Sequence, residues 1–197
     1  MQENIYATPE SSLADPIQDK IPLEFYVVSL KKFTVLFCVT LGLYSIYWFY
    51  QNWKNYRTIH NNKVSPVPRA IFNIFFTHSL CRKIDNALLQ KNITHQWKPM
   101  LQATLYVLLS LLNTVYDYII GDTIAPIHSV LISIGILFLY LPIMLNIQAA
   151  INVSQQDRAG SCNAQFTAAN YVWVAIGLLF WALVAVGFVM EAGLFIL

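Results

Sequence analysis

Four stretches of the chain consist almost entirely of apolar residues, and each predicts a helix that crosses a membrane. They cover residues 33–50, 100–116, 127–145 and 171–190. A spanning helix needs about 20 mostly apolar residues, because the hydrocarbon layer of a bilayer is about 30 Å thick. The pattern therefore predicts an all-α fold, a multi-pass transmembrane helical bundle with three to four spans.

A fifth stretch, residues 66–90, repeats its apolar positions with the period of an α-helix. The residues that recur every four positions are Phe72, Phe76, Leu80, Ile84 and Leu88. Ser65 and Pro66 precede them, and this pair is typical of a helix start, with serine as the N-cap and proline in the first turn. We predict a cytoplasmic amphipathic helix. Its apolar face lies either on the inner leaflet or against the bundle.

Composition supports lipid as the solvent for most of the chain. The 197 residues are 57% hydrophobic and 11% charged, whereas a soluble domain has about 25% charged residues. Residues 1–20 are polar and acidic and contain Pro and Ser, which predicts a mobile N-terminal tail. Residues 21–197 then form a single integral membrane domain. The three cysteines form no C-x-x-C pair, so neither a disulfide framework nor a thiolate zinc site is expected.

The basic residues are concentrated between the first two apolar stretches. Eight of the twelve Lys and Arg residues lie within residues 51–99, against one acid, Asp85. The turn around Asp122 has no basic residue. Because cytoplasmic loops are enriched in Lys and Arg, the loop 51–99 is predicted to be cytoplasmic and the turn to face outward. The amphipathic helix adds three candidate contacts for anionic lipid or a partner: Arg69, Arg82 and Lys83.

The first apolar stretch allows two topologies. Lys31 and Lys32 precede it, which favours a cytoplasmic N-terminus, whereas one full crossing would put the N-terminus outside. Gly42 lies in the middle of the stretch and is a weak point in a helix. A helix that breaks there, dips into one leaflet and returns would keep both basic flanks in the cytoplasm. Non-helical backbone at such depth must be covered by protein. Both topologies stay open at this point.

Aromatic residues follow this glycine over several helical turns. Trp and Tyr prefer the headgroup level of a membrane, so the run predicts a membrane anchor. Gly42 itself either allows another backbone to approach or allows the helix to bend. The residues of this candidate anchor are Thr40, Gly42, Tyr44, Tyr47, Trp48 and Trp53.

The same residues carry a resemblance to a known family. The sequence TLGLYSIYW at 40–48 resembles the motif T-L-G-[I/L]-Y-x-x-Y-W, which recurs in small bacterial multi-pass inner-membrane proteins that carry a domain of unknown function. The flanking sequence FYQNWK at 49–54 also resembles that family, and the resemblance extends over about residues 26–76. It implies an integral protein of the bacterial inner membrane. It brings no established activity, so no catalytic residue is carried over.

Amides at the end of the third apolar stretch are a further set of candidates. Such amides either bind neighbouring helices by hydrogen bonds or line a polar path. Asp117 and Asp122 would stand at the outer mouth of that path. The amides concerned are Asn146, Gln148 and Asn152.

Other polar groups give little support for chemistry. His78, Arg82 and Asp85 share a face of the amphipathic helix, but one His and one Asp are too few ligands for zinc. The chain has no nucleotide-binding, serine-hydrolase or zinc-protease motif.

We therefore expect a non-enzymatic accessory or scaffolding protein of the inner membrane, without cofactor or metal. Its expected partners are the lipid bilayer, anionic lipids in particular, and either a second copy or another membrane protein. No nucleic-acid partner is expected. The alternative is a small channel or transporter subunit that acts as a homo-oligomer, because so few helices form a pore only by assembling.

Overall fold

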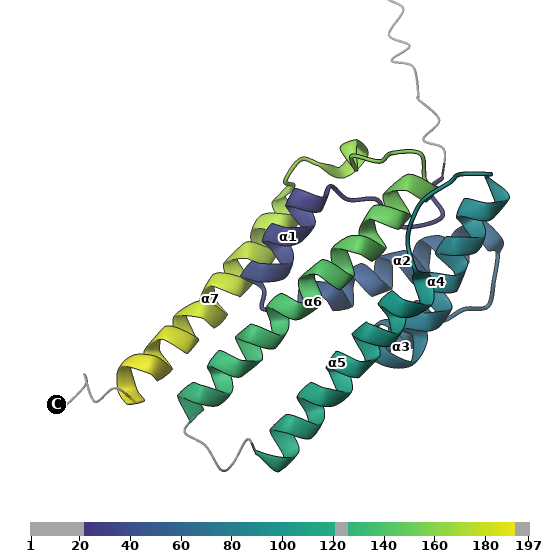
Figure 1. Cartoon of the computed structure of the whole chain (residues 1–197). Helices are drawn as coiled ribbons and strands as arrows, with labels where there is room; N and C mark the ends of the chain where they lie inside the picture. Colours follow the sequence, from purple (N-terminus) through teal and green to yellow (C-terminus); the bar gives the residue numbers. More distant parts are fainter. Residues whose placement is uncertain (1–21, 121–125, 192–197) are drawn as a thin grey trace, which may run out of the picture.

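The computed structural model describes residues 22–120 and 126–191, and over these residues the chain is all-α, as the sequence predicts. The predicted mobile tail, residues 1–20, lies outside the described residues. Seven α-helices and one short 3-10 helix are formed in the described part (Figure 1). They are α1 (Leu30–Val39), α2 (Tyr44–His60), α3 (Pro66–Ile71), α4 (Asn73–Gln90), α5 (Pro99–Ile119), α6 (Pro126–Ser154), η1 (Ser161–Asn163) and α7 (Ala168–Glu191).

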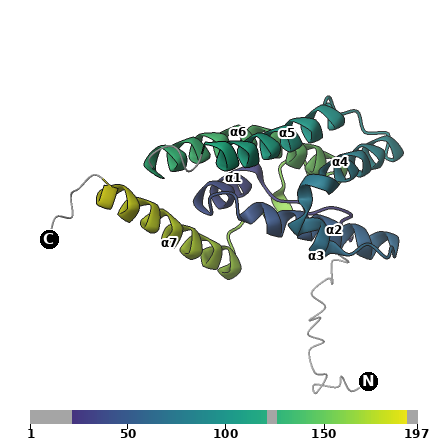
Figure 2. The same cartoon turned by 90° about the horizontal axis from the view of Figure 1, so that it is seen from below.

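The three longest helices form the extended part of the bundle. Helices α5 and α6 pack against each other as an antiparallel pair, and α1 lies between α6 and α7. Seen from below, α5 and α6 occupy one side of the molecule, and α7 with α2 and α3 occupies the other (Figure 2). Helices α2, α3 and α4 gather at the end of the bundle away from the α7 C-terminus.

Two of these helices are long and apolar enough to cross a membrane. They are α6, over His128–Ser154, and α7, over Ala168–Glu191. Most side chains of α7 are exposed, whereas those of α6 are exposed or half-buried up to Pro142 and mostly buried from Ile143 onward. Outward-facing apolar side chains along a whole helix are what contact with lipid requires. Helix α5 forms where another span was predicted, with 21 residues. Its crossing of a membrane stays a prediction.

The first apolar stretch is not one continuous helix. Helix α1 ends at Val39 and α2 begins at Tyr44, with a turn between them. Leu41 and Gly42 have positive φ angles of 50° and 82°, which an α-helix cannot accommodate. Of the two alternatives that the sequence left open, the helix break at Gly42 is therefore the one present. The ten residues of α1 extend only about 15 Å, half the thickness of the hydrocarbon layer.

The amphipathic helix expected over residues 66–90 is divided at Phe72 into α3 and α4. Its start after Ser65 at Pro66 is as predicted. Asn73 stabilises the division, because its Nδ2 donates to the Ala70 carbonyl at 3.0 Å and its Oδ1 accepts from the Tyr106 hydroxyl at 2.6 Å.

The apolar face of α4 packs against the bundle. Leu80, Ile84 and Leu88 are buried in the core, and α4 contacts both α5 and α6. Phe72, at the division, remains 55% exposed. Of the two placements that the sequence left open, packing against the bundle accounts for the C-terminal part of the face.

Candidate functional site

The helix break is bridged by the side chain of Thr40, which is fully buried. Its hydroxyl donates to the Leu36 carbonyl at 2.7 Å and accepts from the Tyr44 backbone N–H at 3.0 Å. The Gly42 N–H donates to the Phe37 carbonyl at 2.8 Å. The end of α1 and the start of α2 are thus capped within the break itself.

Two other helices cover the break. From α7, the Trp181 indole N–H donates to the Cys38 carbonyl at 3.3 Å. Gly177 of the same helix lies so close to Val39 that a Cβ there would stand 2.2 Å from the Val39 carbonyl oxygen. From α6, the side chain of Leu137 approaches Gly42. The interruption therefore has the protein cover that the sequence analysis required for non-helical backbone at membrane depth.

An extended segment before α1, here called the N-terminal strap (residues 24–29), is held by the amides of α6. Gln148 donates from Nε2 to the Tyr26 carbonyl at 3.1 Å and to Asn152 Oδ1 at 2.7 Å. Asn152 donates from Nδ2 to the Val28 carbonyl at 2.9 Å. The Trp48 indole N–H donates to Gln148 Oε1. Trp48, Gln148 and Asn152 are fully buried, where an unpaired amide would be costly.

This arrangement bears on the candidate polar path. Gln148 and Asn152 form hydrogen bonds with backbone and side-chain atoms of their own chain. Asn146, by contrast, is exposed on another face of α6. The three amides are not brought together. Amides that are hydrogen-bonded within one chain count against a homo-oligomeric pore, in which they would face the central axis. Of the two acids proposed for its mouth, Asp122 and the Asp117 side chain lie outside the described residues.

Sequence reasoning missed two residues of this network. Asn52 accepts from the Tyr26 N–H at 3.0 Å and donates to the Trp48 carbonyl at 2.9 Å. Asn163 donates to the Val27 carbonyl at 2.9 Å. Asn52 had a signal, since it is an amide inside an otherwise aromatic helical run. Asn163 had none, because it lies in a polar loop.

Lys32, which the sequence suggested as a basic flank of the membrane segment, is instead 2% exposed. Its Nζ donates to Asn163 Oδ1 at 2.7 Å and to the Gln165 carbonyl at 2.6 Å. Gly160 of the same loop lies directly against the strap at Val28. Lys32 therefore attaches the loop between α6 and α7 to the start of α1.

The anchor residues fall into two groups. Tyr44, Trp48 and Trp53 are fully buried in the core. Tyr47 is half-buried, beside Tyr26 and Trp173. The structure gives the first three a packing role, because the break turns their face of α2 toward α1 and α4–α6.

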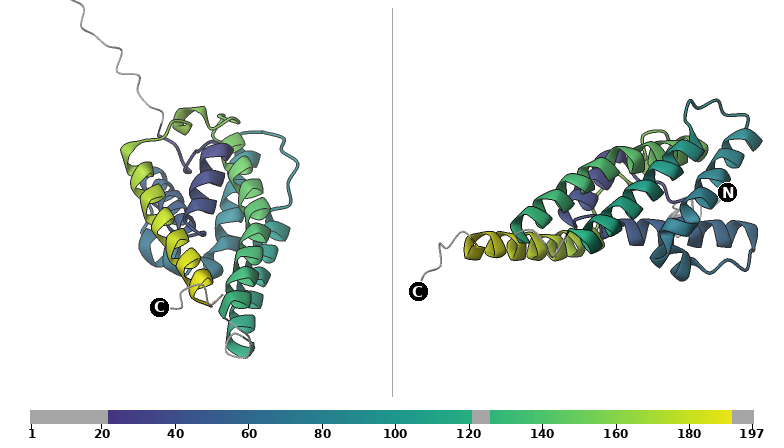
Figure 3. Two further views of the ribbon diagram at one scale, coloured as in Figure 1. Left: turned by 90° about the vertical axis from the view of Figure 1, so that its left-hand side faces the viewer. Right: turned by 60° about the horizontal axis from the view of Figure 1, so that its bottom comes forward.

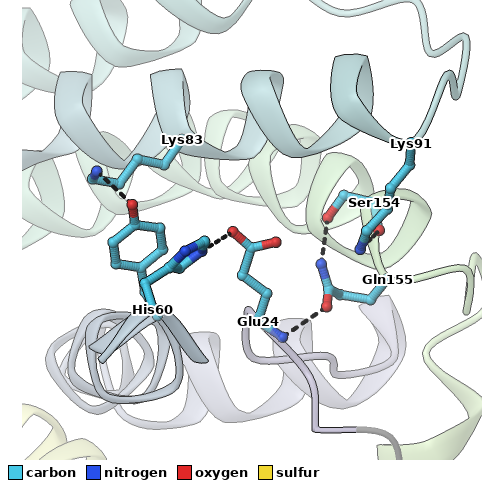
Figure 4. A network of polar contacts seen from close by, with 7 residues as sticks. Glu24, His60, Lys83, Lys91, Ser154 and Gln155 are labelled. Atoms are coloured by element: carbon cyan, nitrogen blue, oxygen red, sulfur yellow. Dashed lines mark hydrogen bonds and ion pairs between the residues drawn. The ribbon is translucent and has the colours of Figure 1, made fainter. Parts of the chain in front are cut away.

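One end of the bundle collects polar contacts from four segments (Figure 4); we call it the polar end. His60, in the last turn of α2, is paired with the Glu24 carboxylate at 2.7 Å. The Glu24 backbone N–H donates to Gln155 Oε1 at 2.8 Å. Lys91 donates to the Ser154 carbonyl at 2.7 Å. The strap and the C-terminal ends of α2, α4 and α6 thus meet at the same end.

The three candidate basic contacts do not form one patch. The Arg69 guanidinium lies over the ring of Trp53, 4.4 Å from its centroid, and is half-buried. Lys83 donates to the Tyr56 hydroxyl at 2.9 Å and is also half-buried. Arg82 alone of the three is fully exposed. Cation–π contacts of this kind stabilise the packing of α3 and α4 on α2.

Two polar residues on the candidate face of α4, His78 and Asp85, are bound to neighbours. His78 Nε2 lies 3.2 Å from Thr104 Oγ1, and Asp85 accepts from the Trp97 indole at 3.0 Å. Cys81 is buried, and this burial raises the pKa of its thiol to about 12. Within residues 22–120 and 126–191, no three His, Cys, Asp or Glu side chains gather as a metal site would require.

Comparisons of the chain with protein-family models, with curated proteins and with solved structures find no match. The resemblance to the bacterial inner-membrane family thus stays a prediction that depends on the motif at 40–48.

Proposed function

We propose that the chain is a multi-pass integral protein of the bacterial inner membrane with a non-enzymatic accessory or scaffolding role. In this arrangement α5, α6 and α7 cross the bilayer. Helices α1 and α2 form a hairpin that enters from the cytoplasmic face and returns to it. The support comes from the long apolar helices, the covered break at Gly42, and the contacts at the polar end.

The contacts at the polar end are the main support for the proposed membrane topology. Glu24 before α1, His60 at the end of α2 and Gln155 after α6 are joined there. Residues 51–99, from within α2 to the start of α5, contain eight of the twelve Lys and Arg residues and are cytoplasmic by the positive-inside rule. If His60 is cytoplasmic, Glu24 is too. The chain between them then enters and leaves on one side, which suits a helix as short as α1.

The accessory role is supported by the hydrogen bonds of the buried amides, which join parts of the same chain. Asn52, Gln148 and Asn152 hold the strap to the bundle, and the oxygen and nitrogen of each of these amides are hydrogen-bonded within the chain. Their hydrogen bonds stabilise an architecture. Function is then expected at the surface, through lipid or another membrane protein.

Cysteine labelling tests the topology. In a background with Cys38, Cys81 and Cys162 changed to Ser, single cysteines are introduced as Pro22→Cys, Lys63→Cys and Tyr118→Cys, all at exposed positions. A membrane-impermeant maleimide added to cells with a permeabilised outer membrane should label Tyr118→Cys only. The other two should react after lysis. Labelling of Pro22→Cys in intact cells would establish a full crossing instead, and labelling of Lys63→Cys would invert the orientation.

Native mass spectrometry after gentle extraction tests the role. A monomer or dimer that retains another membrane protein is expected. A closed homo-oligomer without a partner would contradict the accessory role and favour the channel.

A further inference from the structure

An apolar groove of about 450 Å³ opens between α2, α3 and α7. Apolar and aromatic side chains line it, and most of them are partly exposed. Figures 2 and 3 show these three helices on the same side of the bundle, away from α5 and α6. The main lining residues are Leu43 from the turn before α2, Ile46, Tyr47 and Tyr50 from α2, Ile71 from α3 and Trp173 from α7.

The α2 wall of this groove continues into two cations. Tyr47, Tyr50, Lys54 and Arg57 follow one another at spacings of three and four residues, which places them on one face of the helix. Lys54 and Arg57 are exposed. The groove is therefore lined by apolar side chains, and two positive charges lie beyond its end along α2.

The length of this face matches one leaflet. Leu43, beside the helix break, and Lys54 are separated by about 16 Å along α2 at the usual helical rise. Half of the hydrocarbon layer is about 15 Å thick. In the proposed topology the groove begins near the bilayer centre and its cations reach the headgroups of the inner leaflet.

The four acids whose side chains the structure describes all lie away from this face of α2. Glu24 is paired with His60, Asp85 accepts from Trp97, and Asp157 accepts backbone N–H groups in the loop after α6. Glu191 lies at the opposite end of α7. None of these four carboxylates lies at Lys54 or Arg57, so both cations can contact a lipid phosphate.

We propose that this groove binds an anionic phospholipid of the inner leaflet, with an acyl chain between α2, α3 and α7 and the phosphate at Lys54 and Arg57. The inference rests on the proposed topology. Charge complementarity selects this occupant, because an apolar helix of a partner or of a second copy would fill the groove and leave the two cations without a counter-ion. Lys and Arg side chains near a membrane surface favour contact with anionic lipid.

Native mass spectrometry of the full-length protein with defined lipids tests the proposal. The wild type should retain phosphatidylglycerol in preference to phosphatidylcholine. Lys54→Gln combined with Arg57→Gln should weaken phosphatidylglycerol binding about tenfold or more, and phosphatidylcholine binding should stay the same. The charge-matched control is Lys63→Gln combined with Arg158→Gln, both exposed positions outside the groove, which should bind as the wild type does.

A second variant tests the groove itself. Ile71 is 59% exposed, so Ile71→Trp should fold normally while it fills the groove, and retention of both lipids should fall. Unchanged lipid selectivity in the Lys54/Arg57 variant, unchanged retention in Ile71→Trp, or a dimer whose formation expels the lipid would each overturn the proposal. The cysteine labelling distinguishes failure of the topology from failure of the lipid site. If Lys63→Cys is labelled from outside, the proposed topology is wrong, whatever the lipid measurements show.

Discussion

The indole N–H of Trp48 donates a hydrogen bond to the side-chain carbonyl of Gln148, across 100 residues of chain. Trp48 belongs to the aromatic motif after the helix break, and Gln148 belongs to the amides of α6. Through Gln148 the motif is also connected to the N-terminal strap at Tyr26. Residues that sequence analysis assigned to two separate roles, an anchor and a polar path, thus form one buried network.

Gln148→Ala should destabilise the protein by about 1–3 kcal/mol, because it leaves the buried Trp48 N–H and the part-buried Tyr26 carbonyl without a partner. Thermal unfolding in detergent, followed by tryptophan fluorescence, measures the loss. Asn146→Ala is the matched control, since this amide is two residues away and exposed. Equal effects of the two changes would contradict the structural role of Gln148.

Gly177→Ala should lower the midpoint of unfolding, because the new Cβ would stand 2.2 Å from the Val39 carbonyl oxygen and force α7 away from α1. Gly187→Ala on the same helix provides the comparison, since a Cβ there meets no atom within 4 Å. A cost of about 1–3 kcal/mol is expected for the first change only. The idea fails if both variants unfold like the wild type.

Lys32→Met should loosen the loop between α6 and α7, because both hydrogen bonds from Nζ to that loop are lost. Hydrogen–deuterium exchange of the backbone amides in residues 160–167 should become faster. Lys31→Met removes the same charge from an exposed neighbour and should leave the exchange unchanged. If Lys31→Met has the larger effect, Lys32 does not hold the loop.

Asp157 should make stability depend on pH. Its carboxylate accepts the backbone N–H groups of Cys162 and Ser161, each at 2.8 Å, and these bonds hold the pKa of Asp157 below its ordinary value of 3.8. Since the pKa in the folded protein is the lower one, the stabilisation is present above the ordinary value and disappears as pH falls through the folded value.

Asp157→Asn should therefore unfold at a lower temperature than the wild type at pH 7, and the difference should shrink as the pH falls below the ordinary carboxyl pKa. Calorimetry or fluorescence melts of both proteins over this range measure it. A difference that stays constant with pH would mean that the carboxylate charge has no part in the loop.

Much of the helical architecture could be predicted from the sequence because the signals are local. Continuous apolar runs predicted α6 and α7, and Ser65 with Pro66 predicted the start of α3. Gly42 marked the break, where a positive φ angle is needed. The division at Phe72 was missed, because it depends on Asn73 and its contact with Tyr106 from another helix.

The sequence by itself determined the all-α class, the apolar helices and the one-sided charge, because each depends on the kinds of residue that follow one another along the chain. Only the tertiary structure decided the partners of the buried polar groups. Lys32, Asn52 and Gln148 each bind atoms of residues distant in sequence. In a buried environment every such group needs a partner, and which partner is near depends on how the helices fold back on one another.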